Sequence, residues 1–255
     1  MHTILLSVAL MLGAAAPAPS QSNTADDPRA LTVLTRMADN IGALHSCSFR
    51  LETSNDEWDA EAGMLVNLHN THEVCLVGPD KMLVNTTGDA GHRGFWYDGE
   101  QAYTYWYGEN NYGRVSAPKN IIEMIRAIHE AYGVDFPAAD LLSPTFVDDL
   151  LAQSQQVMFH DTVRIGDQEC FHILAKGADQ DMEVWVANDA ATLPVKYLFR
   201  TRENGQVTEY QATFTDWKMN PDLPYTLFRF TPPPGSREVR MVARNEKPNS
   251  GGQKK

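Results

Sequence analysis

Positive charge is scarce in this sequence. Its 255 residues contain 33 Asp and Glu against 21 Lys and Arg, which gives a formal net charge of −12 at pH 7. Binding to nucleic acid requires an excess of basic side chains, because they must neutralise phosphates, so we expect no nucleic-acid partner. The last twenty residues are the exception, with six basic side chains against two acidic ones. We expect this basic tail, residues 236–255, to be disordered, either as a solvated end or in contact with anionic lipid head groups.

Long apolar runs are also missing, apart from one short run at the amino terminus. Residues 4–12 (ILLSVALML) are too few to span a bilayer as a helix, but they fit the apolar core of an export signal, which is about 7–15 residues long. Two A-x-A cleavage patterns follow between residues 14 and 18, and prolines then interrupt any helix. We expect residues 1–20 to be a signal peptide and the mature protein to work in the periplasm.

Cysteine is rare, and its three positions leave two interpretations open. An exported protein meets an oxidising environment, where Cys47 and Cys75 on neighbouring predicted strands could form a disulfide. The alternative is three buried free thiols, Cys170 included. With an odd count, one thiol stays unpaired in either case.

Sequence motifs for catalysis are absent. The chain has no G-x-S-x-G elbow, Walker A loop or dinucleotide-binding fingerprint. His69 and His72 are spaced as in some zinc sites, but no third ligand stands in a suitable frame, and two surface histidines near a turn are the simpler interpretation. Cys170 and His172 share one face of a predicted strand. We expect no catalytic residue, no metal and no cofactor.

Hydrophobic patterning predicts one domain of mixed composition. Residues 27–44 have helical spacing, with Asp26 or Asp27 as the cap and Pro28 in the first turn. Later, an amphipathic helix is expected over residues 119–132, ended by Gly133, with shorter helical pieces at 137–142 and 145–152. The expected strands are 48–53, 63–69, 73–77, 82–86, 93–98, 102–107, 156–165, 168–175, 182–187, 194–201 and 207–219.

Aromatic residues are concentrated in one stretch, with eight between residues 95 and 112. They either pack the sheet through cross-strand pairs or line an apolar site for a lipid or a sugar. The helix over residues 119–132 should cover the apolar face of the sheet, and incomplete cover leaves a cavity. The predicted ligand-binding residues are Trp96, Tyr103 and Tyr105 from the strands, and Ile121, Ile122, Ile125 and Ile128 from the helix.

Several stretches together resemble a known family. They are DPRAL at 27–31, FWYDG at 95–99, YGRVSAP at 112–118, DFPAADLL at 135–142, GDQECFHI at 166–173, VWV at 184–186 and LPVK at 193–196. In their order and spacing, over residues 27–235, the chain resembles a proteobacterial family of predicted periplasmic proteins of unknown function. That family is itself similar to the LolA/LolB lipoprotein-carrier superfamily.

The resemblance implies an α+β fold over residues 27–235, a strongly curved antiparallel β half-barrel with helices packed on the concave face. It also implies an apolar cavity and no enzymatic activity. In lipoprotein carriers an arginine on an early strand tethers the helical lid, and Arg50 is the candidate for that role here.

Two functions are compatible with these expectations. The first is a monomeric, non-enzymatic periplasmic protein that carries or senses a lipid, an acyl chain or a lipoprotein in its cavity. The second is a protein-interaction module in envelope assembly or stress sensing, which would present edge strands or aromatic side chains to an envelope protein.

Overall fold

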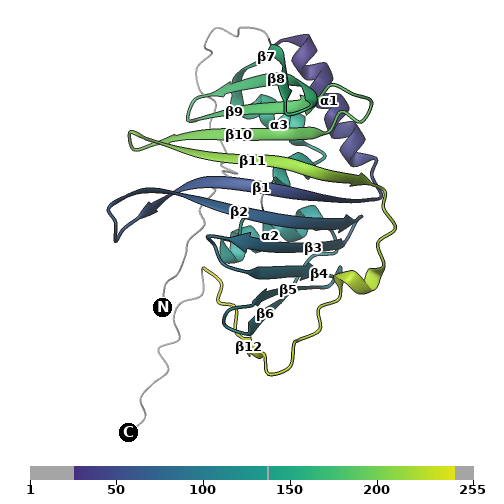
Figure 1. The fold of residues 1–255 in the computed structure, drawn as a ribbon, viewed down its shortest axis with the longest axis vertical. Coiled ribbons are helices and arrows are strands. Elements are labelled where there is room, and N and C mark those ends of the chain that lie inside the picture. Colours follow the sequence, from purple (N-terminus) through teal and green to yellow (C-terminus); the bar gives the residue numbers. More distant parts are fainter. Residues whose placement is uncertain (1–25, 137, 245–255) are drawn as a thin grey trace.

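A single large sheet dominates the computed structural model, which describes residues 26–136 and 138–244. Within these residues twelve strands are ordered β12-β6-β5-β4-β3-β2-β1-β11-β10-β9-β8-β7 (Figure 1). Neighbouring strands are antiparallel, except that β12 runs parallel to β6. A mostly antiparallel sheet with separate helices agrees with the expected α+β class. The expected signal peptide, residues 1–20, lies outside the described residues.

The elements follow one another as a helix, a run of strands, a helical insert and a second run of strands. The helices are α1 (Pro28–Gly42), α2 (Ile121–Tyr132) and α3 (Phe146–Gln153), with short 3-10 helices η1 (Ala139–Leu142) and η2 (Tyr225–Phe228). The strands are β1 (Ser46–Asp59), β2 (Met64–Val77), β3 (Lys81–Gly88), β4 (Arg93–Tyr97), β5 (Gln101–Trp106), β6 (Asn111–Ser116), β7 (Ser154–Ile165), β8 (Gln168–Gly177), β9 (Gln180–Ala187), β10 (Pro194–Glu203), β11 (Gln206–Met219) and β12 (Arg237–Val239).

Local signals determine where the two longer helices begin and end. The Asp27 carboxylate accepts a hydrogen bond from the backbone N–H of Arg29 at 2.8 Å, and so caps α1. The Asn120 side chain caps α2 in the same way, accepting from the N–H of Ile122 at 2.8 Å. Gly133 ends α2 in a left-handed conformation, φ 68°, which glycine adopts without steric cost.

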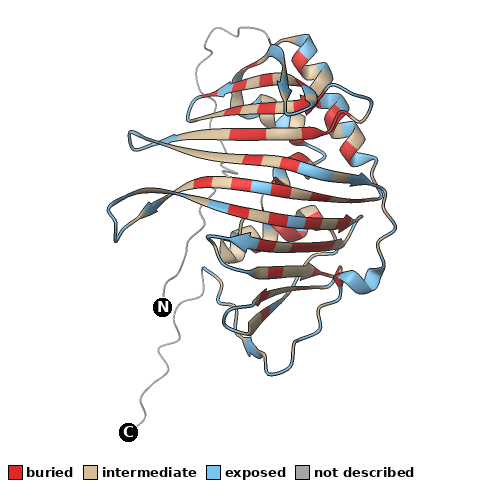
Figure 2. Ribbon diagram, in the orientation of Figure 1, coloured by how far each residue is buried: buried red, intermediate tan, exposed pale blue. Residues whose placement is uncertain are grey.

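Buried residues alternate with less buried ones along several strands (Figure 2), as expected when side chains alternate between the two faces of a sheet. One face carries the core residues Phe49 and Leu51 of β1, and we call it the helix-side face because the helical insert packs on it. Phe95 of β4 meets Phe136 with ring centroids 4.8 Å apart, and the hydroxyl of Tyr197 accepts from the Ala138 N–H at 3.0 Å. The opposite face is called the open face.

Strand β2 differs from the expectation of two separate strands at 63–69 and 73–77. Asn70, Thr71 and His72 pair in unbroken register with Thr53, Glu52 and Leu51 of β1, so no turn interrupts the strand. His72 is consequently buried on the helix-side face, whereas His69 is exposed. The interpretation of both histidines as surface residues near a turn is therefore wrong for His72.

The carboxyl-terminal segment is ordered further than expected. We call residues 229–244 the C-terminal strap. Its strand β12 pairs with β6 and satisfies backbone groups at that edge of the sheet, and the N–H of Arg244 donates to the Ala131 carbonyl at 2.7 Å. The strap thus passes around the β6 edge, from Phe230 on the open face to Met241 beside Gly113 on the helix-side face. The expectation of disorder from residue 236 is wrong for residues 236–244.

Candidate functional site

A small cavity lies between the helix-side face of β3–β6 and the carboxyl-terminal half of α2. Its volume is about 110 Å³, which is below the roughly 300–1,000 Å³ of pockets for drug-sized ligands. Most of its wall is apolar and comes from Val84, Phe95, Ala102, Val115, Ile128, Tyr132, Val134, Phe136 and Met241. An apolar wall of this kind favours an apolar guest, because burial of hydrocarbon surface is the main gain on binding.

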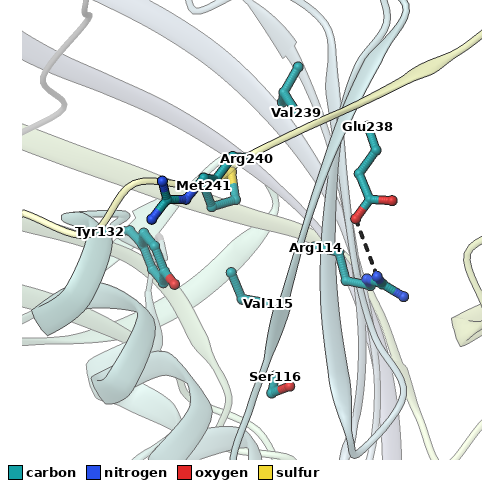
Figure 3. A pocket seen from close by; sticks show the side chains of 8 residues that line it. All are labelled: Arg114, Val115, Ser116, Tyr132, Glu238, Val239, Arg240 and Met241. Carbon is teal, nitrogen blue, oxygen red and sulfur yellow. Dashed lines mark ion pairs between the residues drawn. The ribbon is translucent and has the colours of Figure 1, made fainter. Parts of the chain in front are cut away.

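The cavity adjoins a wider cleft of about 650 Å³ (Figure 3). Figure 3 shows Tyr132 of α2, Val115 and Ser116 of β6, and Arg240 and Met241 of the strap around this cleft. Val115, Tyr132 and Met241 line both spaces. Met241 of the strap therefore lies where the cavity and the cleft meet.

One end of the cavity is polar. The row His72–Thr86–Arg93–Trp106 runs across β2 to β5 in register on the helix-side face. The imidazole of His72 has a threonine hydroxyl at each nitrogen, Thr53 at 3.0 Å from Nε2 and Thr86 at 2.9 Å from Nδ1. Burial, and to a smaller extent the charge of Arg93, lowers the pKa of His72 to about 4. The ring is therefore neutral at pH 7 and supplies polarity without charge.

Arg93 is the cationic group at this polar end. Within the described ranges, its guanidinium makes no hydrogen bond and no ion pair. Burial lowers the pKa of Arg93, and the carboxylate of Glu57 raises it. Glu57 accepts a hydrogen bond from the Asn55 amide at 3.1 Å, and its own pKa is raised by burial. Because a guanidinium stays protonated in proteins, the cavity has a positive end with free donors.

A histidine–carboxylate pair lies where α2 ends. Nδ1 of His129 and a carboxylate oxygen of Asp135 are 2.6 Å apart, and both side chains are largely withdrawn from water. Asp135 also lines the cavity. This pair holds the segment after Gly133 against α2, and so positions Phe136 over Phe95.

The seven predicted ligand-binding residues do not form one site. Ile128 and Tyr103 are the two that line the cavity, and Tyr103 borders it with its backbone, because its ring lies on the open face. Trp96, Tyr103 and Tyr105 direct their rings to the open face, where Phe230 of the strap packs at centroid distances of 5.0, 5.2 and 6.0 Å. Ile121, Ile125 and Ile128 are buried in the core of the helix-side face, and Ile122 is half-buried.

Sequence reasoning missed His72, Arg93, Phe136 and Met241 as lining residues. The first two share a face only because β2, β3 and β4 pair in one register. Strand alternation within β4 already separates Arg93 and Phe95 from Trp96, and this was the signal available. The position of Met241 depends on the path of the strap, which no local pattern indicates.

Arg50 does not tether the helices. Its side chain lies on the open face, where it is 42% exposed and approaches Glu52 at 3.6 Å and Glu73 at 4.0 Å. In β1 the odd-numbered residues Phe49 and Leu51 face the helices, so strand alternation directs Arg50 away from them. Exposed ion pairs of this kind contribute about 0–1 kcal/mol.

The expected disulfide between Cys47 and Cys75 is not formed. Both thiols are free. In the β1–β2 register, Cys47 is opposite Leu76 and Cys75 is opposite Ser48. Residues opposite one another share a face, so Cys75 lies on the face of Ser48. Cys47 is the neighbour of Ser48 in β1 and therefore points to the other face. The two thiols cannot reach disulfide geometry without a register shift.

Nothing near Cys170 and His172 resembles a nucleophile and its base. Burial raises the pKa of the Cys170 thiol, and a thiol that stays protonated is a poor nucleophile. His172 instead stacks on Trp185, with centroids 4.3 Å apart, and bonds to Glu183 at 2.8 Å.

Among the residues that the structure describes, no three metal-ligating side chains gather in one place. In the same part of the chain, no helix has the length and apolarity needed to cross a membrane.

The fold and the cavity define a class of protein: one mostly antiparallel sheet with a helical insert over an apolar pocket that has a positive end. The chain belongs to the family of predicted periplasmic proteins DUF2092, whose model matches residues 30–242. The protein is periplasmic, as the expected export signal at its amino terminus predicts. No curated protein sequence matches the chain.

Several solved structures are similar to this chain. An uncharacterised conserved protein from Thermus thermophilus is 13% identical, with a TM-score of 0.49 and coverage of 83% of this chain and 99% of that one. LprF from Mycobacterium bovis is 11% identical, with a TM-score of 0.47 and coverage of 78% and 97%. The LolA superfamily protein NE2245 from Nitrosomonas europaea is 12% identical, with a TM-score of 0.33 and coverage of 79% and 97%. Similarities at this level assign no function.

Proposed function

We propose that this periplasmic protein has no enzymatic activity and binds an acyl chain, presented by a lipid or a lipoprotein, in the cavity between α2 and β3–β6. The observation that supports this most is the apolar wall of the cavity and its continuation into the wider cleft. Each methylene of an acyl chain that leaves water contributes about 0.8 kcal/mol, so a short buried length gives useful affinity.

The proposal extends to the shape of the sheet. An acyl chain needs walls on several sides, and a sheet that curves around α2 as a half-barrel, with the helices on its concave face, would supply them. Residues 27–235 would form this domain, and the strap would close the β6 edge. The protein would act as a monomer, because walls from one chain surround the cavity.

Filling the cavity should weaken binding. Thr104 lies on the helix-side face of β5 and lines the cavity. We expect Thr104→Phe to weaken the binding of dodecanoate at least tenfold, because the ring occupies the space of the chain. Native mass spectrometry after gentle purification, followed by calorimetric titration with dodecanoate, measures this.

The matched control is Thr71→Phe. Thr71 is half-buried on the open face of β2, opposite Thr87 of β3, so this variant should bind dodecanoate as tightly as the unmodified protein does. If the unmodified protein copurifies with no lipid and binds no acyl ligand, the proposed function is wrong. Equal binding by both variants would place the ligand elsewhere.

A second function is favoured by a different observation. The β1–β2 and β10–β11 hairpins project from the same side of the sheet (Figure 1). Three large apolar side chains on them are more than half exposed, Trp58 at 56%, Met64 at 57% and Val207 at 54%. Large apolar side chains that are exposed on projecting hairpins offer contacts for a protein partner, which fits a module for envelope assembly or stress sensing.

Crosslinking in intact cells tests this second function. A photo-crosslinking residue at Trp58 should give one stoichiometric adduct with an envelope protein, whereas the same residue at Tyr225, which is 70% exposed elsewhere on the molecule, should not. Scattered weak adducts from both positions would speak against a specific partner at the hairpins.

A further inference from the structure

The cationic side chain of Arg93 distinguishes this cavity from a simple apolar pocket. Burying a charged group costs free energy unless hydrogen bonds and an opposite charge compensate it. Arg93 is partly withdrawn from water, lines the cavity, and has no hydrogen-bond or ion-pair partner within the described ranges. Glu57 acts on this charge electrostatically but forms no ion pair with it, so the arrangement contributes little to stability, and this points to a role in ligand binding.

We propose that Arg93 binds the anionic head group of the ligand, a carboxylate or a phosphate, while the acyl chain extends along the apolar wall towards the cleft. The inference rests on the proposed function and deepens it by naming the ligand class. The guanidinium offers a planar fork of N–H donors, and two oxygens on one carbon or phosphorus match that fork.

The surroundings of Arg93 favour a head group at this end. The neighbouring polar groups, His72 and Thr86, already bond to each other at 2.9 Å, so they accommodate a polar head without competing for the guanidinium. The negative groups nearby are engaged as well, Glu57 by the Asn55 amide and Asp135 by His129. A ligand oxygen therefore meets free donors on Arg93.

The direction of the bound acyl chain follows from the sheet register. From Arg93 the helix-side face of β4 continues to Phe95, and this row then meets Thr104 of β5 and Gly113 of β6. Val115 and Met241 come next and also line the cleft. Successive side chains on one face of a strand are about 6.6 Å apart, so the path from the guanidinium to the cleft suits a linear chain.

The test compares ligands that share a chain and differ in the head. Dodecanoate, dodecyl phosphate and methyl dodecanoate are titrated into the full mature protein by calorimetry, together with inorganic phosphate alone. We expect the two anionic lipids to bind at least tenfold more tightly than the methyl ester. Inorganic phosphate should not bind measurably, because it gains nothing from the apolar wall.

The variant Arg93→Gln should lose about tenfold to hundredfold in affinity for both anionic lipids, the range for loss of charge-assisted hydrogen bonds. Its affinity for the methyl ester should stay within about twofold of the original, which also shows that the variant is folded. The control is Arg50→Gln: Arg50 lies on the open face, away from the cavity, and approaches Glu52 at 3.6 Å and Glu73 at 4.0 Å, so the preference for anionic heads should persist.

The outcomes separate the two proposals. Binding of all three lipids without discrimination, or an unchanged preference in Arg93→Gln, would overturn the role of Arg93 and leave the acyl cavity standing. Binding of inorganic phosphate as tight as that of dodecyl phosphate would reassign the site to small anions. No binding of any lipid would overturn the proposed function and this inference together.

Discussion

Met241→Ala is expected to raise the affinity for an acyl ligand by about threefold to tenfold. Met241 lines both the cavity and the cleft, and its sulfur lies so close to Gly113 that a β-carbon there would be 2.3 Å away. The thioether therefore occupies space that a chain passing between the cavity and the cleft would need. Displacing a fully buried methionine costs roughly 1.5–3 kcal/mol. Met241 is half-buried, so about half of that cost applies, which corresponds to about threefold to tenfold in the dissociation constant.

Calorimetric titration of dodecanoate into both proteins measures this effect. Val242→Ala is the matched control, because Val242 is the next residue of the strap and is 60% exposed. Its affinity should equal that of the unmodified protein. Weaker binding by Met241→Ala would mean that Met241 is part of the wall that holds the ligand, and would contradict its role as an obstacle.

The largest expected effect on stability comes from His72. Its pKa is about 4 in the folded protein, lowered first by burial and then by the charge of Arg93, against 6.5 for an unperturbed histidine. Below pH 6.5 the unfolded chain binds a proton that the folded protein excludes, so the free energy of unfolding falls as the pH drops. The loss ends near pH 4, where both states are protonated. It amounts to roughly 3 kcal/mol over this window.

His72→Gln should remove this part of the pH dependence, because glutamine does not titrate while its amide can still bond to the hydroxyls of Thr53 and Thr86. Urea unfolding at about pH 7, 6 and 5 for both proteins, compared as a difference, removes the contribution of the carboxylates. His69→Gln, an exposed position on the same strand, should follow the unmodified protein. Parallel pH profiles for His72→Gln and the unmodified protein would contradict the prediction.

Elements with local causes were predictable. The stripe of isoleucines in α2 recurs at helical spacing, and the signals that bound the helix, Asn120 and Gly133, are adjacent to it in the chain. The capping of α1 by Asp27 is equally local. Such features depend on residues within about four positions of each other, which one sequence displays directly.

Features that depend on pairing between distant strands were not predictable. Each strand alternates its faces, so a shift of one residue exchanges the two sides. The register of β1 and β2 separates Cys47 from Cys75, and strand alternation turns Arg50 away from the helices. The same kind of register aligns His72 with Arg93. No single segment contains this information.

The sequence by itself predicted export to the periplasm and the helical insert from local patterns, and it pointed to the family and its α+β fold through the resemblance of several stretches. The tertiary structure alone decided which side chains meet in the cavity. Strand register placed Arg93 on the helix-side face and the aromatic residues Trp96, Tyr103 and Tyr105 on the open face. The strap placed Met241 at the cavity because its strand β12 pairs with the β6 edge. Such pairing between distant segments is not encoded in composition.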